Sequence, residues 1–206
     1  MKCSFRHERA LYAQGLLCVA GIDEAGRGPL AGPVVAAAVI LPGKYSHKLL
    51  TDSKELSPQT RDNLHAELLA NPKVCVGVAI VGVEEIDCLN ILRATHEAMR
   101  RAVSALSSTP DHVLIDGLPV LPFPIPQTAL VGGDRLSFSI AAASVVAKVT
   151  RDRLMIEHDA QFPDYEFARH KGYGTALHLE RLRKHGPCEI HRRSFFPVRE
   201  AFVPLV

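Results

Sequence analysis

Two adjacent carboxylates, Asp23 and Glu24, lie between an apolar run and a glycine-rich turn in the segment 21–29 (GIDEAGRGP). Carboxylate oxygens are ligands that hard divalent cations prefer, and magnesium is usually held by a few of them together with water and substrate phosphate. Neighbouring strand residues point to opposite faces, so both carboxylates serve one site only if the strand ends and bends there, as Gly26 and Gly28 permit. A solvated acidic turn is the alternative interpretation of these two residues alone.

Two further aspartates, Asp116 and Asp134, fall at or just after predicted strand ends. The first closes the apolar run 113–116 (VLID), and the second follows two glycines after the run 125–131. Open α/β sheets gather ligands at such ends, so these side chains are candidates for the same site. Taken singly, either aspartate is more typical of an ordinary turn.

Basic and hydroxyl side chains that suit phosphate contacts recur at helical spacing. Ser144, Lys148 and Arg151 stand at positions i, i+4 and i+7 of a predicted helix, so they share one face. Together with Lys54 they are candidates for contacts to a phosphate backbone, although a solvated basic stripe is the alternative for each of them. A second basic cluster could extend such a surface and consists of Arg181, Arg183, Lys184, Arg192 and Arg193.

The glycines of 26–32 superficially resemble a dinucleotide-binding fingerprint, because they follow a strand. That fingerprint opens a helix whose N-terminus faces a pyrophosphate. Here Pro29 and Pro33 interrupt the segment, a second strand is predicted to follow, and the neighbouring carboxylates would repel a metal-free pyrophosphate. We therefore do not expect a dinucleotide site.

His185, Cys188 and His191 have a spacing that could suggest zinc. They offer three ligands, whereas structural zinc normally has four, and Pro187 lies between them. We interpret Cys188 as a free thiol. The five cysteines are odd in number and scattered without a C-x-x-C pair, which is typical of a reducing compartment.

The elements that must position these residues can be outlined from hydrophobic patterning. Apolar, β-branched runs predict strands over 16–23, 34–41, 74–81, 113–116 and 125–131. Helical spacing and capping residues predict helices over 58–69, 91–106, 137–161 and 176–185. The predicted strands and helices do not follow a regular βαβ alternation, so we expect a mixed sheet flanked by helices.

The composition is that of one compact domain. The chain has 206 residues, 47% of them hydrophobic, which is enough for a core. The net charge is only +2, so any binding of nucleic acid must come from a local basic face. The sequence contains no apolar run of about 18 residues, and the first ten residues are unlike a signal peptide. We expect a cytoplasmic protein.

Taken together, these motifs resemble ribonuclease HII, a type 2 ribonuclease H. The similarity begins with 21–35 (GIDEAGRGPLAGPVV) and continues in order to about residue 200. The other matching motifs are 52–54 (DSK), 115–117 (IDG), 133–134 (GD), 142–152 (AASVVAKVTRD), 171–175 (KGYGT) and 191–198 (HRRSFFPV). The related ribonuclease HIII carries an extra N-terminal substrate-binding domain, and the roughly 20 residues before the first motif here favour type HII.

The resemblance implies an α/β fold, a ribonuclease H-like mixed β-sheet flanked by helices. The single catalytic domain would cover 1–206, with a core of about 16–161 and a small C-terminal helical extension over 162–206 that contributes substrate contacts. It also implies catalytic, metal-binding carboxylates at Asp23, Glu24, Asp116 and Asp134. The family mechanism is two-metal hydrolysis with Mn²⁺ or Mg²⁺, with two ions expected when substrate is bound and no histidine base required.

Ribonucleotide recognition is assigned by the resemblance to Gly26, Arg27, Gly28 and Tyr173. The 2′-hydroxyl separates RNA from DNA, and reading it needs the close backbone approach that glycines allow. The expected substrates are RNA–DNA hybrids and duplex DNA with embedded ribonucleotides, cut on the 5′ side of the ribonucleotide to leave 3′-hydroxyl and 5′-phosphate ends. A monomer without a membrane association or an obligate protein partner is expected.

Two other functions remain open. Another ribonuclease H-fold nuclease, such as a resolvase, would share the carboxylates. The motifs at Gly26, Arg27, Gly28 and Tyr173 speak against it, because its DNA substrate has no 2′-hydroxyl to read. A non-catalytic hybrid-binding module would need no complete set of four carboxylates. A metal-dependent cleavage assay separates this module from an enzyme.

Overall fold

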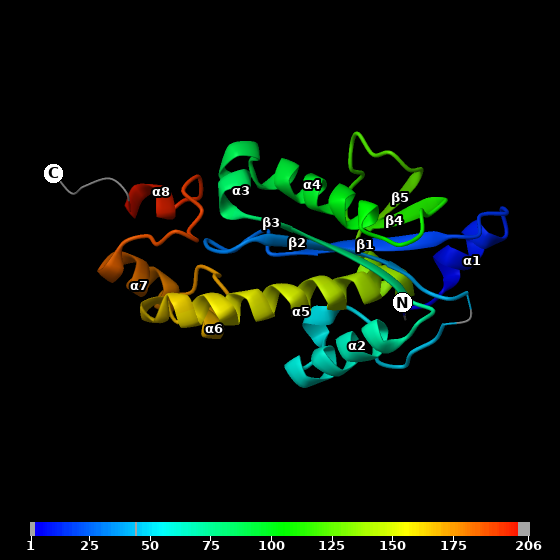
Figure 1. Cartoon of the computed structure of the whole chain (residues 1–206), viewed down its shortest axis with the longest axis horizontal. Coiled ribbons are helices and arrows are strands. Elements are labelled where there is room, and N and C mark those ends of the chain that lie inside the picture. Colours follow the sequence, from blue (N-terminus) through cyan, green and yellow to red (C-terminus); the bar gives the residue numbers. More distant parts are fainter. Residues whose placement is uncertain (1–2, 44, 202–206) are drawn as a thin grey trace.

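The centre of the protein is a five-stranded sheet, seen here in a computed structural model that describes residues 3–43 and 45–201 (Figure 1). The strands are β1 (Val19–Ala25), β2 (Val34–Ile40), β3 (Cys75–Val81), β4 (His112–Asp116) and β5 (Gln127–Leu130). Their order is β3-β2-β1-β4-β5. The β1–β2 and β2–β3 pairs are antiparallel, whereas β1–β4 and β4–β5 are parallel. The predicted mixed sheet is therefore confirmed.

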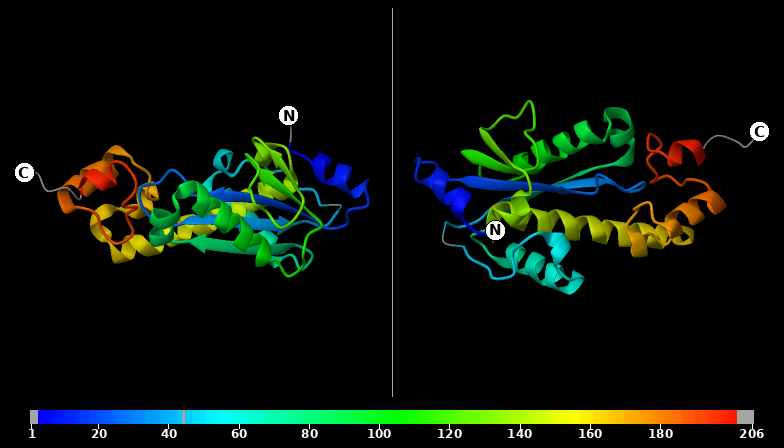
Figure 2. Two further views of the ribbon diagram at one scale, coloured as in Figure 1. Left: turned by 90° about the horizontal axis from the view of Figure 1, so that it is seen from above. Right: turned by 180° about the vertical axis from the view of Figure 1, so that it is seen from behind.

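Helices cover both faces of this sheet (Figures 1 and 2). The helices are α1 (Arg6–Tyr12), α2 (Pro58–Ala70), α3 (Val83–Leu89), α4 (Ile91–Ser104), α5 (Phe138–Gln161), α6 (Phe167–His170), α7 (Ala176–His185) and α8 (Val198–Ala201). Short 3-10 turns are η1 (Ser53–Glu55), η2 (Gly133–Arg135) and η3 (Pro163–Tyr165). Helices α3 and α4 lie over one face, and the long helix α5 with α2 lies over the other.

Strand β2 shows why the sheet is buried on both sides. Its sequence is apolar throughout, and successive residues point to opposite faces. Val35, Ala37 and Val39 join the core formed with α5 and α2. Ala36 and Ala38 join the core formed with α4. The small alanines let both helices approach the strand closely.

Helix α5 begins close to strand β1, and two residues explain how. The Ser137 hydroxyl caps the helix by accepting a hydrogen bond from the N–H of Ile140, at 3.2 Å. A Cβ on Gly21 would lie 2.1 Å from the backbone carbon of Ser139, so only glycine permits this approach. The sheet and the long helix are thus locked together beside Asp23.

The structure corrects two expectations about elements. Strand β1 does not end and bend at Asp23 but stays paired with β2 through Ala25. Helices α1 and α3 were not predicted, because each is only seven residues long and neither shows a long apolar period. The other predicted strands and helices are present with shifted ends, and Asn90 caps α4 as expected.

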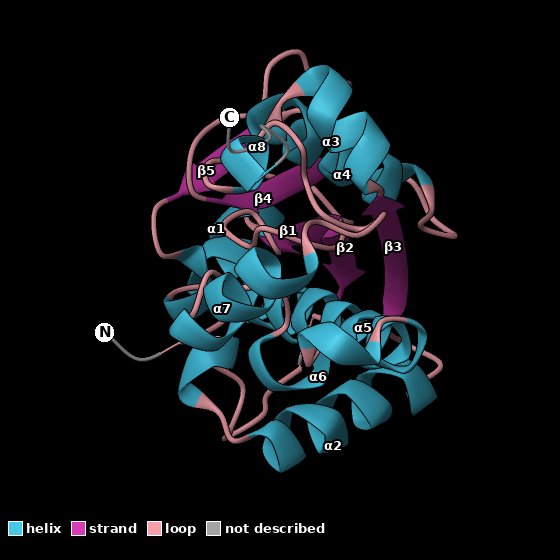
Figure 3. Cartoon of the chain, turned by 90° about the vertical axis from the view of Figure 1, so that its left-hand side faces the viewer, coloured by secondary structure: helices cyan, strands magenta, loops and turns pink. Residues whose placement is uncertain are grey.

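Helices α6, α7 and α8 gather at one end of the sheet (Figures 1 and 3). The predicted C-terminal extension over 162–206 is helical in part, and its residues 202–206 lie outside the described residues. The division into a core and an extension stays a prediction. In the described part of the chain, none of the helices has the length and apolarity needed to cross a bilayer.

Candidate active site

A groove with a volume of about 420 Å³ lies where strand β1 ends. The predicted site residues that line it are Asp23, Glu24, Gly26, Arg27, Gly28, Lys54, Ser144, Lys148 and Tyr173. They come from β1 and the turn after it, from η1, from α5 and from the segment before α7. Residues more than 140 positions apart in the sequence, such as Glu24 and Tyr173, therefore share one surface.

Asp23 lies on the side of the sheet that faces α5 and is only 5% exposed. Its carboxylate accepts a hydrogen bond from the N–H of Glu24 at 2.7 Å and another from the hydroxyl of Ser144. Burial raises the pKa of Asp23 well above its ordinary value, and the charges of Glu24 and Asp116 raise it further. Asp23 therefore binds a proton, or a cation in place of the proton, more readily than an exposed aspartate does.

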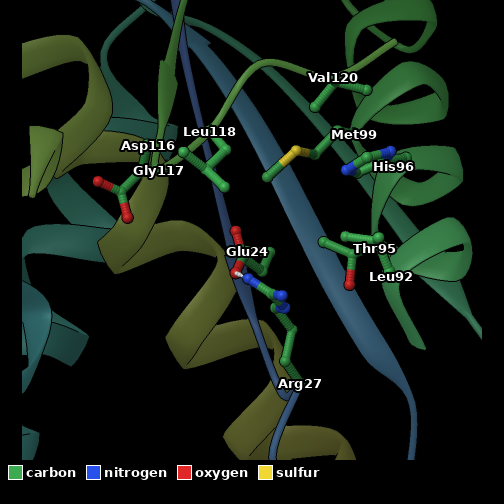
Figure 4. A pocket seen from close by; sticks show the side chains of 10 residues that line it. All are labelled: Glu24, Arg27, Leu92, Thr95, His96, Met99, Asp116, Gly117, Leu118 and Val120. Atoms are coloured by element: carbon green, nitrogen blue, oxygen red, sulfur yellow. Dashed lines mark hydrogen bonds and ion pairs between the residues drawn. The ribbon is translucent and has the colours of Figure 1, made fainter. Parts of the chain in front are cut away.

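Glu24 and Asp116 line a second cavity, of about 150 Å³, between β1, β4 and helix α4 (Figure 4). The Glu24 carboxylate accepts a hydrogen bond from the guanidinium of Arg27 at 3.4 Å. Burial raises the pKa of Glu24, Arg27 opposes this shift and Asp116 adds to it. Asp116 Oδ1 accepts a 2.6 Å hydrogen bond from the N–H of Gly133. Glu24 reaches both cavities because it stands one residue before the end of β1, so no bend at Asp23 is needed.

Asp134 is the fourth predicted carboxylate and is only 5% exposed. Burial, together with the charges of Asp52 and Asp116, raises the pKa of Asp134 to about 6. Burial by itself lowers the pKa of Lys54, yet this pKa lies above its ordinary value because of four carboxylates: Asp52, Asp23, Asp134 and Asp116. Lys54 therefore lies within electrostatic reach of the four predicted carboxylates and of Asp52.

The donor set of this region fits a divalent cation. All four predicted ligands are carboxylates, and three of them have raised pKa values because of burial and mutual repulsion. Carboxylates that repel one another gain most from a shared hard cation. Within residues 3–43 and 45–201, no group of three or more His, Cys, Asp or Glu side chains is already close enough together to hold an ion. The carboxylates surround the site without forming a closed ligand shell.

The structure brings Tyr173 beside the glycine-rich turn. A Cβ on Gly28 would lie 3.9 Å from Tyr173 Cε1, and Leu30 donates its N–H to the carbonyl of Gly172 at 2.8 Å. Tyr173 keeps 42% of its surface exposed, so its ring is available to a ligand in the groove. The predicted grouping of the turn with Tyr173 matches this geometry.

Arg151 departs from the expected phosphate contact. It is 1% exposed, and its guanidinium donates to the carbonyls of Pro33, Ala31 and Lys171 at 2.9, 3.1 and 3.0 Å. Burial lowers the pKa of Arg151. The helical spacing was interpreted correctly, but this position of α5 faces the β1–β2 loop and not the solvent.

Arg192 is a second buried cation, which corrects its place in the predicted basic cluster. It is fully buried and donates to the carbonyls of Gly26, Arg27 and Gly32 at 2.6, 3.0 and 2.9 Å. Burial lowers the pKa of Arg192 to about 9. Arg151 and Arg192 therefore fix the inward-facing carbonyls of the loop whose other side lines the groove.

The remaining candidates for phosphate contacts have neighbours of their own. Ser144 is buried, with its hydroxyl 2.8 Å from that of Ser53, and acts directly on Asp23. Lys148 pairs with Asp152 at 2.6 Å, and burial lowers the pKa of Lys148. Lys148 lines both the groove and an adjoining cavity of about 360 Å³.

Sequence reasoning missed two polar residues of the groove, Ser53 and Arg61, and the role of Asp52 beside it. Ser53 lies in the 52–54 motif, and Arg61 donates to the carbonyls of Ser53 and Leu56 at 2.8 and 2.6 Å. Asp52 is 3% exposed and accepts hydrogen bonds from the N–H of Lys54 and from Arg135. The motif itself was a signal for Asp52 and Ser53, whereas the position of Arg61 on a helix gave none.

Cys188 is a free thiol, and its neighbour His191 is buried. Burial raises the pKa of Cys188 to about 11, so the thiol stays protonated. Its Sγ lies 3.1 Å from Nδ1 of His191. In the predicted basic cluster, Arg181 pairs with Glu166 at 2.5 Å, and Arg183 and Lys184 are exposed.

Comparison with known proteins gives a consistent result. The sequence model of the family described as ribonuclease HII matches residues 20–198. The ribonuclease HII of Geobacillus kaustophilus (strain HTA426) is 57% identical over 195 residues, which cover 95% of this chain and 74% of that protein. The ribonuclease HII of Moorella thermoacetica (strain ATCC 39073 / JCM 9320) is 57% identical over 188 residues, which cover 91% of each chain.

Solved structures agree in fold. The crystal structure of the ribonuclease H2 from Pyrococcus horikoshii OT3 matches with a TM-score of 0.74 and 26% identity, over 90% of this chain and 97% of that one. The crystal structure of Bst-RNase HIII in complex with Mn²⁺ matches with a TM-score of 0.63 and 20% identity, over 93% of this chain and 72% of that one. The second likeness is one of fold alone.

Proposed function

The chain belongs to the ribonuclease HII family, and we propose how its own residues carry out the reaction of that family. It is a ribonuclease H endonuclease that acts on RNA–DNA hybrids and depends on a divalent metal ion. Nicking of duplex DNA at embedded ribonucleotides is a general property of the family. The proposal concerns which residues hold the metal, which read the ribonucleotide and which bind phosphate.

The observation that carries the proposal is the composition of the groove along its length. Buried carboxylates with raised pKa values lie at one part of it, and Gly28 and Tyr173 lie side by side at another. A duplex bound along the groove would present a ribose to the second part and the neighbouring phosphodiester to the first. Such an arrangement would support cleavage beside the recognised sugar, and the resemblance to the family implies that the cut is on its 5′ side.

Asp23, Glu24, Asp116 and Asp134 would hold the metal, and we propose two ions, Mn²⁺ or Mg²⁺, with substrate bound. Such ions supply activation of the attacking water and stabilisation of the departing 3′ oxygen. Asp23 and Glu24 are fixed by strand β1, and the Asp116 carboxylate is held by the N–H of Gly133. The backbone positions of these ligands are thus fixed, and their side chains would close around the ions when metal binds.

The glycine-rich turn is held in place by hydrogen bonds to its main-chain carbonyls. Arg151 and Arg192 bind the carbonyls of the β1–β2 loop from within the protein. A sugar could then approach the outer side of Gly28 without meeting a Cβ, and Tyr173 could pack against the same sugar. Lys54 and Lys148 line the groove and are the cations proposed to contact phosphate.

Replacing a proposed ligand tests this assignment. Asp116→Asn keeps the size of the side chain but removes a charge that metal binding uses. We expect cleavage to fall by more than about 100-fold, because even the loss of a partner of a metal ligand costs about 10–100-fold. Asp164→Asn, an exposed aspartate of η3, is the matched control and should cleave normally. Near-normal cleavage by Asp116→Asn at limiting metal would remove Asp116 from the site.

A second substitution tests ribonucleotide reading. Tyr173→Ala should strongly reduce cleavage of a duplex with one ribonucleotide, because this substrate offers a single sugar to hold in place. The loss on a continuous hybrid should be smaller, since other registers remain available there. Binding should change little, because phosphate contacts supply most of the affinity. A Tyr173→Ala variant that cuts the single-ribonucleotide duplex normally would contradict the role given to Tyr173.

Several finer expectations stay predictions. They are a cytoplasmic location, a monomeric state and the lack of an obligate protein partner. The Pyrococcus and Bst structures do not test them. A DNA-only nuclease of the same fold would ignore the 2′-hydroxyl, so comparing the single-ribonucleotide duplex with an all-DNA duplex of the same sequence separates it from the function proposed here.

A further inference from the structure

Three buried histidines that the proposed reaction does not use lie behind Tyr173. His170, His178 and His191 are 8%, 0% and 1% exposed, and they lie among α6, α7 and the turn that follows α7. The rings of His170 and His178 stack with 4.4 Å between their centroids. Burial lowers the pKa of His178 to about 4 and that of His191 to about 3, so both are neutral at neutral pH.

The hydrogen bonds between these histidines run in one direction only. The main-chain N–H of Cys188 donates to His191 Nδ1 at 3.0 Å, so a neutral His191 must carry its proton on Nε2. His191 Nε2 then donates to His178 Nε2 at 3.0 Å, which leaves the proton of His178 on Nδ1. That Nδ1 lies 2.9 Å from the carbonyl oxygen of Tyr173 and donates to it. Each bond fixes the tautomer needed for the next one.

These hydrogen bonds form a relay from Cys188 through His191 and His178. The relay ends on the main chain of Tyr173, the residue that faces the groove. The N–H of Tyr173 donates to the carbonyl of His170, at 2.9 Å. Nδ1 of His170 accepts the N–H of Gly172 at 3.2 Å, and the carbonyl of Gly172 accepts the N–H of Leu30 at 2.8 Å. The Tyr173 backbone is therefore held on both sides, whereas its ring is 42% exposed.

The relay starts in a segment that also holds the glycine-rich turn. His191 forms a bridge with Ala31, and the next residue, Arg192, donates to the carbonyls of Gly26 and Arg27. Arg192 thus holds the glycine-rich turn directly, and its neighbour His191 holds Tyr173 through His178. The turn and Tyr173 are the two halves of the proposed ribonucleotide-reading surface. The distance between Gly28 and Tyr173 is set from this shared anchor.

We propose that His178 is a positioning residue for ribonucleotide recognition, which it serves by holding the Tyr173 carbonyl at a fixed distance from the turn that Arg192 holds. The inference rests on the role proposed above for Tyr173. It goes beyond that role in naming a buried histidine, remote from the metal ligands, on which the geometry of recognition depends.

Two substitutions of His178 each break one bond of the relay. In His178→Asn the amide N–H lies near the place of Nδ1 and can still donate to Tyr173, but the bond to His191 is lost. In His178→Gln the amide lies near the place of Nε2, so the bond to His191 can persist and the one to Tyr173 is lost. His158→Gln is the control. His158 lies on α5, away from the relay, and its ring Nδ1 lies 3.3 Å from Oε1 of Gln161. The free energy of unfolding is measured for all three.

We expect His178→Asn to keep a kcat close to that of the wild type on a duplex with one ribonucleotide. His178→Gln should lower kcat by about 10- to 100-fold, the range that a misplacement of about 1 Å can cause, with little change in KM. In a Tyr173→Ala background His178→Gln should cause no further loss. Equal kcat losses in the Asn and Gln variants, or an undiminished effect of His178→Gln in that background, would overturn the proposal.

The recognition role of Tyr173 and the positioning role of His178 can be contradicted separately. Normal cleavage by Tyr173→Ala contradicts the role of Tyr173 and with it the positioning role. Damaged cleavage by Tyr173→Ala together with normal cleavage by a folded His178→Gln contradicts the positioning role alone. If the variants fold poorly, ¹⁵N shifts of the wild-type imidazoles test the direction of the hydrogen bonds on which the positioning role depends. A proton on Nδ1 of His178 and on Nε2 of His191 is expected, and the opposite pair of tautomers would overturn the relay.

Discussion

Asp134 connects the electrostatics of single residues to metal binding. Its folded-state pKa of about 6 lies above the ordinary value of 3.8. The folded state therefore binds the proton more tightly than the unfolded state, so this group favours folding at low pH. That contribution is lost as the pH rises from about 4 to about 6, and a penalty on the order of 1–3 kcal/mol remains above it.

Asp134→Asn should remove this penalty. In metal-free buffer at pH 7 the variant should have a larger free energy of unfolding than the wild type, and the difference should shrink toward pH 4. Added Mn²⁺ or Mg²⁺ should stabilise the wild type more than the variant, because a ligand stabilises the state that binds it. Urea unfolding across this pH range is the measurement. If the free energies of unfolding of the two proteins depend on pH in the same way, folding does not raise the pKa of Asp134.

Among single residues, the sequence identified those that line the groove. It did not indicate which residues are buried behind the groove. Asp23, Glu24 and Tyr173 could be found because motifs carry them. Arg151 and Arg192 were expected to face phosphate, since an arginine is rarely buried without a carboxylate. Both arginines lie in the motifs 142–152 and 191–198. Their partners are loop carbonyls, which any residue supplies, so nothing in these motifs indicates that the two side chains are buried.

Among the elements, the start of α5 depends on a short helix far away in the sequence. Glu8 of α1 is fully buried, and its Oε1 accepts hydrogen bonds from the hydroxyl of Ser137 at 2.6 Å and the N–H of Ser139 at 2.9 Å. A carboxylate at a helix N-terminus is favoured by the free N–H groups and by the helix dipole. Helix α1 therefore caps the helix that carries Ser144 and Lys148.

Glu8→Ala should lower the free energy of unfolding by about 1–3 kcal/mol, because two hydrogen bonds to a charged group are lost at a buried helix end. Glu157→Ala, an exposed position near the other end of α5, should change it by less than about 0.5 kcal/mol. Denaturant unfolding of both variants gives the comparison. An equal effect at the two positions would mean that α1 adds nothing to the start of α5.

The same contact shows which elements the sequence could predict. Strand β2 is a continuous apolar run, α4 has a strong hydrophobic period, and α4 and α5 also have capping residues at their first turns. Helix α1 has seven residues and is ordered by Glu8 and Leu11, whose partners lie elsewhere in the chain. The extension of β1 beyond Asp23 depends on pairing with Ala36 and Val35 of β2. Such tertiary contacts cannot be read from a local pattern.

For the whole molecule, a net charge of +2 means that duplex binding depends on where the cations lie. Lys148→Ala should weaken binding to a similar extent for all duplex sequences and reduce the slope of log K against log salt by about 0.9, the share of one phosphate contact. Arg9→Ala is the matched control, since α1 lies at the end of the molecule opposite α7 (Figure 1). An unchanged slope for Lys148→Ala would mean that Lys148 stays paired with Asp152 when a duplex is bound.

The central claim is that the carboxylates and the Gly28–Tyr173 pair act together on one ribonucleotide. The most direct measurement compares two end-labelled duplexes that differ only in a single 2′-hydroxyl, with Mn²⁺ or Mg²⁺ and with a chelator, and maps each cut on a sequencing gel. We expect one cut on the 5′ side of the ribonucleotide, with 3′-hydroxyl and 5′-phosphate ends, only when metal is present. Cleavage of the all-DNA duplex at a similar rate, cutting in the chelator, or an intact single-ribonucleotide duplex would contradict the account.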